Sequence, residues 1–245
     1  MSATKDPRML PALHRHQLAY LREEGWHRIL RRTWDADAQA CLTHWSSHGL
    51  PLVVTRQRAA TAPGPQIVAL GLPAPPSWGK RRIALEASAH EVLYFDEFPT
   101  AARIAPLLRP AAQPAWQRLC EDLAALQVRV RAQGSHGWQT LTGLAHVRAQ
   151  SDIDLWIHVL DAAQTAQVDQ VLARHAPGLE RLDVRLDVEL AGPDGAAVTW
   201  REWRRWLTGE TRQVLIKTLH DARLADAPFG ARPQANNLPV LEATP

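Results

Sequence analysis

Two carboxylates stand two residues apart in the stretch Ser151-Asp152-Ile153-Asp154-Leu155. In a β-strand, residues i and i+2 point to the same face, so Asp152 and Asp154 are expected to converge on one or two hard cations. The positions between and after them form an apolar face for a core: Ile153, Leu155, Ile157 and Val159. A strand with one apolar face and one paired-acid face is what metal-assisted phosphoryl or nucleotidyl transfer requires.

A third acid is expected from the stretch Arg181–Leu190, in which even positions are aliphatic and odd positions are charged. This alternation predicts a strand with one buried face. If that strand pairs beside the first one, Asp183, Asp187 or Glu189 completes a three-carboxylate site suited to Mg²⁺, which prefers hard oxygen ligands. The plainer alternative is that these acids only solvate an exposed sheet face.

A Gly134-Ser135 pair precedes the two acids and predicts a turn that opens a helix. Glycine lets the backbone approach a ligand closely, and Ser135 is able to cap the helix. The free N–H groups of the first helical turn then face an anion such as a phosphate. A phosphate cradle and an acid pair in one strand-turn-helix-strand unit are more specific together than either is alone.

Composition places few limits on function. The 245 residues carry a formal net charge of +3, a hydrophobic content of 46% and a pI near 9.2. There is no long basic run that would favour nucleic acid. Two cysteines form no disulfide framework, and neither a signal peptide nor an apolar run long enough for a bilayer is visible. A cytoplasmic protein is therefore expected.

The elements that must position these residues divide into two units. Residues 13–50 are predicted to be mainly helical, and short strands are predicted at 51–55 and 67–72, with a loop at 60–65 between them. Residues 1–108 thus form a small N-terminal α+β domain. Two prolines in 109–114 predict a linker, followed by a helix at 115–126 and a strand around residues 128–130. The catalytic domain spans 109–225, and 226–245 is expected to be a loosely ordered tail.

The Gly-Ser pair followed by Asp-x-Asp resembles the signature of the polymerase-β-like nucleotidyltransferase superfamily. More closely, the chain resembles the phosphoribosyl-dephospho-CoA transferases, the holo-acyl-carrier-protein synthases of malonate decarboxylase. The residues that carry this resemblance cover nearly the whole chain: Arg15-His16, Pro51–Val54, Ala69–Pro73, Gly79–Arg82, Gly134–Leu144, Ser151–Leu155, Arg181–Leu190, Thr199–Glu202 and Val214–Thr218. The resemblance implies an α+β fold, with a polymerase-β-like domain of mixed sheet and flanking helices behind a smaller N-terminal α+β domain.

The resemblance also implies a reaction. The donor is 2′-(5″-triphosphoribosyl)-3′-dephospho-CoA, the acceptor is a serine of the apo acyl carrier subunit of malonate decarboxylase, and pyrophosphate leaves. Asp152, Asp154 and Asp187 are then expected to bind Mg²⁺, with Asp187 also helping to deprotonate or orient the serine hydroxyl. Gly134, Ser135 and Lys217 are expected to bind the triphosphate.

Lys80, Arg81 and Arg82 are expected to bind coenzyme phosphates or an acidic carrier, although a solvated charge run is an equally simple reading. The choice between Asp183 and Asp187, the number of metal ions, the oligomeric state and the carrier-docking surface stay open. A citrate-lyase carrier is a further possible acceptor. Alternative functions are protein or small-molecule adenylylation and a non-catalytic carrier-binding assembly factor.

Overall fold

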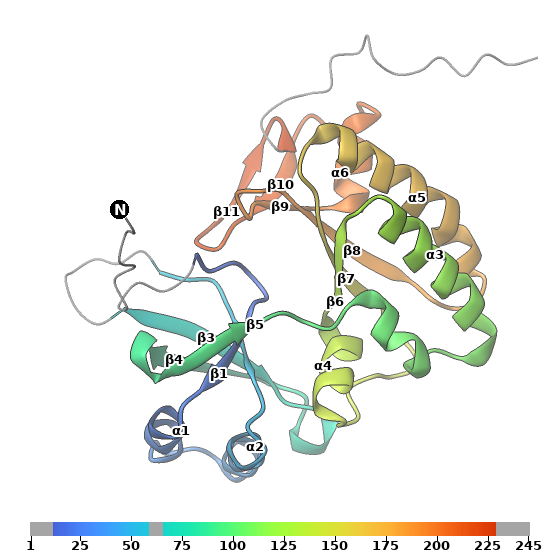
Figure 1. Cartoon of the computed structure of the whole chain (residues 1–245). Coiled ribbons are helices and arrows are strands. Elements are labelled where there is room, and N and C mark those ends of the chain that lie inside the picture. The colour runs from blue at the N-terminus through green and yellow to red at the C-terminus, as the bar shows by residue number, and fades with distance from the viewer. Residues whose placement is uncertain (1–11, 59–65, 229–245) are drawn as a thin grey trace, which may run out of the picture.

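The chain folds into two α+β units, each built on its own sheet (Figure 1). The computed structural model describes residues 12–58 and 66–228. The predicted loop at 60–65 and most of the predicted tail at 226–245 lie outside the described residues. Among the described helices, none combines the length and apolar character needed to cross a bilayer.

The N-terminal sheet is antiparallel, with the order β4(Arg82–Ser88), β3(Ile67–Pro73), β2(Leu52–Val54), β1(Leu18–Leu21), β5(Val92–Asp96). The helices α1(Glu23–Leu30) and α2(Ala36–Ser47) pack on one face of this sheet, as the shared core of Ile29, Leu42 and Trp45 with strand residues shows. Asp35 caps α2 by accepting a hydrogen bond from the Ala38 N–H. The strands predicted at 51–55 and 67–72 are confirmed.

The prediction of mainly helical structure over 13–50 is wrong for its first part. Residues Leu18–Leu21 form β1, which pairs with β2 on one side and β5 on the other. Leu18 and Ala19 are completely buried. The spacing of apolar residues favoured a helix locally, but burial between two neighbouring strands stabilises the extended form.

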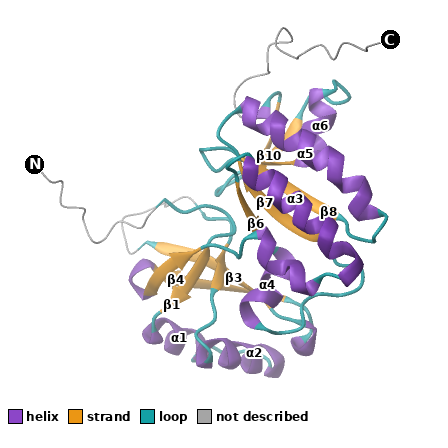
Figure 2. Ribbon diagram, turned by 45° about the vertical axis from the view of Figure 1, so that its right-hand side comes forward, coloured by secondary structure: helices purple, strands orange, loops and turns teal. Residues whose placement is uncertain are grey.

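The C-terminal sheet is mixed, with the order β11(Ala222–Ala225), β10(Val214–Lys217), β9(Ala197–Thr199), β8(Leu186–Ala191), β7(Ile153–His158), β6(Arg129–Ala132). The β7 and β8 strands are parallel, and α5(Ala162–Glu180) makes the crossover between them. The helices α3(Gln113–Ala125), α5 and α6(Trp200–Leu207) share one core with these strands and cover one face of the sheet (Figure 2). The predicted mixed sheet with flanking helices is confirmed.

Two predictions in this domain need correction. The strand predicted at 181–190 begins only at Leu186, because α5 ends at its C-cap residue Arg181 and Asp183 has a left-handed backbone with φ of +55°. The predicted linker at 109–114 is instead helical: a 3₁₀ turn spans Pro110–Ala112, and α3 begins at Gln113. Prolines fit there because the first residues of a helix need no N–H for intrahelical bonds.

The two units pack together through α4(Gly134–Thr142), which begins at the predicted Gly-Ser turn. Its Trp138 is 4% exposed and belongs to the N-terminal hydrophobic core, where it packs perpendicular to Phe98 at 5.3 Å between ring centroids. A Cβ at Gly137 would lie 2.3 Å from the Ala132 carbonyl oxygen and 2.8 Å from Phe98. Gly137 therefore allows α4 to pack against β6 and carry Trp138 into the neighbouring core.

Three short 3₁₀ helices complete the described elements outside this junction: Pro76–Trp78, Ala89–Glu91 and Ala101–Leu107. Ala101, Ile104 and Leu108 already pack in the core of the C-terminal sheet, although β5 ends at Asp96. The chain thus passes from one core to the other around residues 97–100.

Candidate active site

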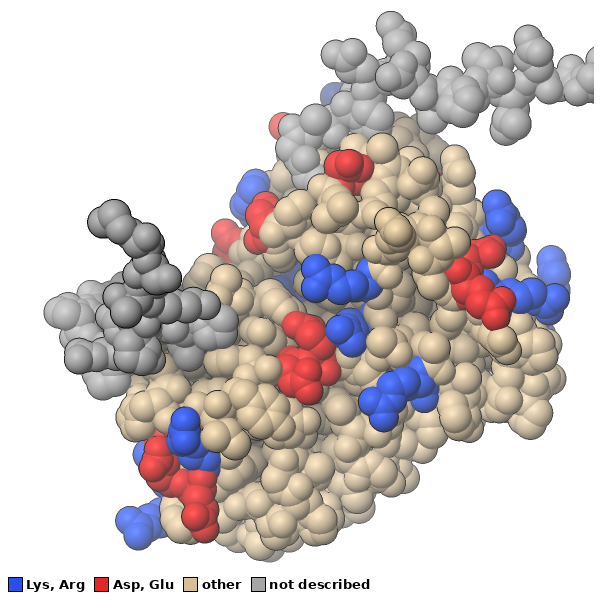
Figure 3. Space-filling view, in the orientation of Figure 1, with Lys and Arg blue, Asp and Glu red and all other residues tan. Residues whose placement is uncertain are grey.

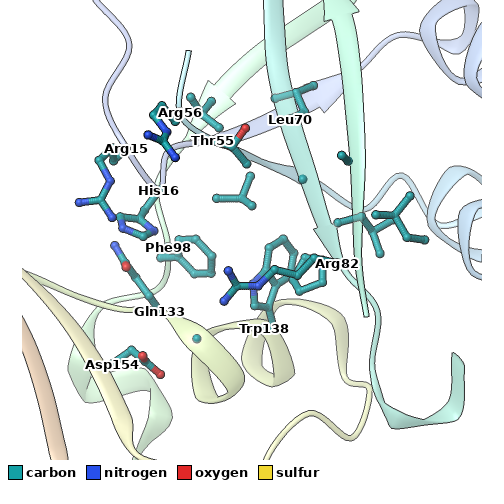
Figure 4. Close-up of a pocket in the computed structure, with 18 of the residues that line it drawn as sticks. Arg15, His16, Thr55, Arg56, Leu70, Arg82, Phe98, Gln133, Trp138 and Asp154 are labelled. Atoms are coloured by element: carbon teal, nitrogen blue, oxygen red, sulfur yellow. The ribbon is translucent and has the colours of Figure 1, made fainter. Parts of the chain in front are cut away.

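A cavity of about 850 Å³ lies between the two sheets and is lined by residues of both units (Figure 4). The C-terminal unit contributes Gly134, Ser135 and Asp154, and the N-terminal unit contributes Arg15 and Arg82. Basic and acidic side chains also gather side by side on the molecular face where the two units meet (Figure 3). A cavity of this size with a few convergent polar groups is typical of a small-molecule site.

Gly134 and Asp154, predicted separately from two motifs, are in direct contact. Gly134 has φ of +54°, and a Cβ built on it would lie 1.9 Å from Oδ2 of Asp154. The N–H of Gln133 donates to the Asp154 carbonyl oxygen at 2.8 Å. The start of α4 therefore rests against the acid-bearing strand, and the two motifs lie side by side.

The prediction that Ser135 caps α4 is wrong. Gln133 occupies the N-cap position, and no side chain caps this helix. Ser135 instead lies inside the first turn and lines the cavity together with Gly134. The first-turn N–H groups thus lack a side-chain acceptor, which leaves this end of the helix suited to an anion.

Asp187 lies beside Asp154, since the two residues are direct partners in the parallel pairing of β8 with β7. Burial raises the pKa of Asp154 to about 6, and the negative charges of Asp187 and Asp152 add to that effect. Asp187 and Asp152 are thus near enough to Asp154 to repel its negative charge. Repulsion of this kind is relieved by a bound cation.

Asp152 lies just before β7 and is paired with Arg185, at 2.7 Å between Nε and Oδ1. Both side chains are about half exposed. Within the described residues, no three His, Cys, Asp or Glu side chains form a preassembled metal cluster. Asp152 is thus engaged by Arg185 in this structure.

Asp183, the alternative third acid, lies away from this group. Its side chain is 81% exposed and is paired with Arg109 at 2.9 Å. The left-handed turn after α5 places it before β8 begins, so it has no partner in β7. Of the two aspartates, the sheet register brings Asp187 to Asp154.

Lys217 lines the cavity, but its Nζ contacts Oε1 of Glu189 at 2.6 Å. Arg15 and His16 reach the other oxygen of Glu189 at 3.1 and 3.5 Å. Burial would raise the pKa of Glu189, but the nearby His16, the charge of Arg15 and the hydrogen bond from Lys217 outweigh it and lower that pKa to about 2. Glu189 thus contacts Arg15, His16 and Lys217 together, and all three of these residues line the cavity.

Residues 100–228 match the family model described as "Phosphoribosyl-dephospho-CoA transferase MdcG C-terminal domain", and residues 14–98 match the model of the N-terminal domain of the same protein. The chain belongs to the phosphoribosyl-dephospho-CoA transferase family. It is therefore an enzyme, and its chemistry is group transfer. No solved structure matches it.

Curated relatives of this transferase carry the same description. The phosphoribosyl-dephospho-CoA transferase of Xanthomonas euvesicatoria pv. vesicatoria is 36% identical over 94% of this chain and 98% of that protein. The transferase of Xanthomonas axonopodis pv. citri is 37% identical over 86% of this chain and 92% of its own length. The transferase of Bradyrhizobium diazoefficiens is 33% identical, with coverage of 86% and 89%.

The second group of cations in this transferase, Lys80, Arg81 and Arg82, lines the cavity from the N-terminal unit. Arg81 forms an ion pair with Asp35 across the surface. Arg82 is exposed, and Figure 4 shows its side chain directed into the cavity. The triplet thus lines the same cavity as Asp154.

Sequence reasoning assigned no role to Arg15, His16 or Arg56, which also line the cavity. Arg15-His16 is one of the segments that carry the family resemblance, whereas Arg56 follows the short strand β2 without a motif of its own. His16 carries one signal visible only in the structure, a left-handed φ of +65°. Their place at the cavity depends on the docking of the two sheets.

The acids of the transferase fit Mg²⁺ in kind. The donors are carboxylate oxygens, which Mg²⁺ prefers, and the raised pKa of Asp154 marks negative charge without a compensating partner. Because the backbone of Gly134 passes close to Asp154, the carboxylate of Asp154 lies beside the start of α4. The helix dipole favours a metal-bound phosphate at that place.

Proposed function

We propose that this chain transfers the 5″-phosphoribosyl-3′-dephospho-CoA group from 2′-(5″-triphosphoribosyl)-3′-dephospho-CoA to a serine of the apo acyl carrier subunit of malonate decarboxylase. The observation that carries the proposal is the direct approach of Gly134 to Asp154, with Asp187 paired beside it, at one end of a cavity. We expect the reaction to take place in the cytoplasm.

The reaction forms a phosphodiester and releases pyrophosphate. The serine oxygen bonds to the α-phosphorus of the donor while the bond from that phosphorus to the bridging oxygen of the pyrophosphate breaks. Asp187, exposed at the edge of the acid group, orients the incoming hydroxyl and accepts its proton. An exposed base suits an acceptor that is a side chain of another protein.

Residues at the helix start and on the cavity walls bind the triphosphate. Gly134 and Ser135 present first-turn N–H groups to it, because no side chain caps α4. Lys217 offsets its charge once the triphosphate competes with Glu189 for the ammonium group. Lys80, Arg81 and Arg82 line the cavity from the N-terminal unit, where they add positive charge for the other phosphates of the coenzyme or for an acidic carrier.

Asp152, Asp154 and Asp187 would hold Mg²⁺, which supplies charge neutralisation for the attacking and leaving oxygens of an in-line displacement. Arg185 holds Asp152 in place until then.

The decisive experiment incubates the purified protein with the triphosphoribosyl coenzyme and the apo carrier of malonate decarboxylase, and weighs the carrier by mass spectrometry. A mass increase by the phosphoribosyl-dephospho-CoA group supports the proposal. Asp187→Asn serves as the matched inactive variant. Parallel reactions replace the donor by ATP or the acceptor by the citrate-lyase carrier. A mass increase only with ATP supports adenylylation instead, and binding with no mass increase supports an assembly factor.

A further inference from the structure

The N-terminal sheet presents a flat, mostly apolar surface to the cavity. Val53 pairs with Gly71, and Gly71 pairs with Ala84, so these three residues form one cross-strand row on the same face. All three line the cavity, and so do Leu70 and Leu72 of the same strand β3 (Figure 4 labels Leu70), although both leucines also belong to the N-terminal core. A Cβ at Gly71 would lie 3.0 Å from Cγ2 of Thr55 and 3.5 Å from Cγ1 of Val53, so these side chains cover Gly71 and form, with the small Ala84, a closely packed floor of the cavity.

Two arginines flank this floor without protein partners. Arg82 is the cross-strand partner of Pro73 at one end of the row, and Arg56 follows the end of β2 at the other. Both are exposed, both line the cavity, and Figure 4 shows both directed into it. Within the described residues, neither forms an ion pair or a side-chain hydrogen bond. Unpartnered guanidinium groups at a cavity are typical of sites for phosphate groups.

A buried histidine adds a polar group to the same cavity. His146 is 9% exposed, lines the cavity and lies 6.3 Å from Trp138 between ring centroids. Its Nε2 is buried and has no hydrogen-bond partner among the described residues. Burial also lowers its pKa to about 4, so the ring is neutral near pH 7 and able to donate or accept at a ligand edge. A buried nitrogen without a partner costs free energy unless a ligand satisfies it.

We infer that this wall binds the adenosine 5′-diphosphate portion of the coenzyme, with the adenine ring on the Val53–Gly71–Ala84 floor and the diphosphate between Arg56 and Arg82. The inference rests on the proposed function. In the donor, the adenosine lies between the triphosphoribosyl arm and the 5′-diphosphate. The cavity has matching regions: the acids and the α4 start at one end, the apolar floor facing Trp138, and the two free arginines beside that floor.

In this assignment, the two units bind different parts of the donor. The C-terminal unit holds the reacting phosphates, and the N-terminal unit recognises the coenzyme by a part that does not react. Binding energy from such a remote part positions the α-phosphorus for attack.

The test measures binding of three probes to the full chain by isothermal titration calorimetry: 3′-dephospho-CoA, ADP and pantetheine. The expected result is that 3′-dephospho-CoA and ADP bind with similar affinity and that pantetheine binds far more weakly. If pantetheine binds as tightly as 3′-dephospho-CoA, or if neither nucleotide binds, the inference is overturned.

Variants locate the site. Arg56→Gln and Arg82→Gln are each expected to weaken 3′-dephospho-CoA binding about tenfold or more, as for loss of a charged hydrogen bond. Arg58→Gln is the matched control, since Arg58 is exposed and does not line the cavity. Ala84→Phe is expected to block the floor and abolish ADP binding. Position 84 is an exposed strand position, which tolerates an aromatic residue. Circular dichroism checks that each variant folds. If Ala84→Phe does not fold, the two arginine variants still test the inference.

The inference is overturned if 3′-dephospho-CoA binds Arg56→Gln, Arg82→Gln and Arg58→Gln with equal affinity. That result would not affect the proposed transfer of the prosthetic group to the carrier. Failure of the proposed function has another signature. In that case the wild-type chain leaves the mass of the carrier unchanged, whatever the binding data show.

Discussion

The backbone of Gly134 passes so close to Asp154 that a Cβ atom at position 134 would lie 1.9 Å from Oδ2 of that carboxylate. The same glycine has φ of +54°, a conformation that side chains disfavour. Together, these two facts allow the start of α4 to lie directly against the acid of β7. Glycine at this position is therefore a condition of the site's geometry.

Gly134→Ala is expected to reduce transfer at least about a hundredfold, because displacement of a catalytic group by about 1 Å has that effect. Gly143→Ala is the matched control. Gly143 also has a left-handed φ, of +71°, but a Cβ there meets nothing within 4 Å. Both variants bear the backbone strain of about 1–2 kcal/mol, so the difference between them in transfer rate and Tm isolates the clash with Asp154. Equal rates in the two variants would remove the geometric role of Gly134.

Asp187→Asn is expected to reduce transfer by orders of magnitude, whereas Asp183→Asn leaves it near the wild-type rate. Asp187 pairs with Asp154 across the sheet, and the exposed Asp183 contacts only Arg109 among charged groups in the described chain. Asparagine tolerates the left-handed backbone at position 183, so the control adds no strain. The measurement is the initial rate of carrier modification at saturating donor. A reversed order would make Asp183 the functional acid.

Asp154→Asn is expected to abolish transfer and, in the absence of metal, to stabilise the fold near pH 8 by on the order of 1–2 kcal/mol. Burial and the charges of Asp187 and Asp152 raise the pKa of Asp154 from 3.8 to about 6. A raised carboxyl pKa means that this group's contribution to stability is complete below its ordinary pKa and is lost as pH rises through about 6. The gain should therefore appear above pH 6 and vanish near pH 4. Urea unfolding with a chelator at both pH values tests this, and an Asp154→Asn variant that is less stable at pH 8 would contradict it.

Arg185→Gln is expected to lower the Mg²⁺ concentration that gives half-maximal transfer. Arg185 competes with the ion for Asp152, but the pair is about half exposed, so the pair is worth at most about 1 kcal/mol and the shift at most about fivefold. Arg181→Gln, at an exposed arginine that ends α5, is the control. A Mg²⁺ titration of the transfer rate gives the answer. A higher Mg²⁺ requirement in Arg185→Gln would instead indicate that Arg185 assists binding of the phosphates.

His146→Phe is expected to flatten the decline of stability in acid. Burial lowers the pKa of His146 from 6.5 to about 4. Because the folded pKa lies below the unfolded one, the contribution of this histidine is complete above pH 6.5 and is lost as pH falls toward 4, at a cost of up to about 2–3 kcal/mol. The comparison is the free energy of unfolding of wild type, His146→Phe and the exposed-site control His220→Phe between pH 7 and 4. A slope unchanged by His146→Phe would show that other groups cause the decline.

Much of the site was readable from local sequence. Glycine before serine, with the apolar residues of α4 behind them, predicts a helix start, and alternation around Asp154 predicts its strand. Trp200, Trp203 and Trp206 recur at helical spacing and form the buried side of α6. These features depend on interactions between residues a few positions apart, which a sequence displays directly.

Other features depended on pairings between distant segments. Leu18–Leu21 has the spacing of a helix, yet it is a strand because β2 and β5 bury it from both sides. The choice of Asp187 over Asp183 follows from where α5 ends and from the register of β8 on β7. Neither is visible in Arg181–Leu190 alone, since alternation continues through both aspartates.

The sequence by itself determined which chemical groups this protein carries: a glycine-serine helix start, paired acids on an apolar strand, and the matches that place it in its family. Only the tertiary structure decided which of those groups meet. The docking of two sheets around Trp138 turned Arg56, Arg82 and the Gly71 floor into a wall facing Asp154. The physical reason is that strand register and the packing of one unit on another are set by burial summed over many residues, and no short stretch of sequence contains that sum.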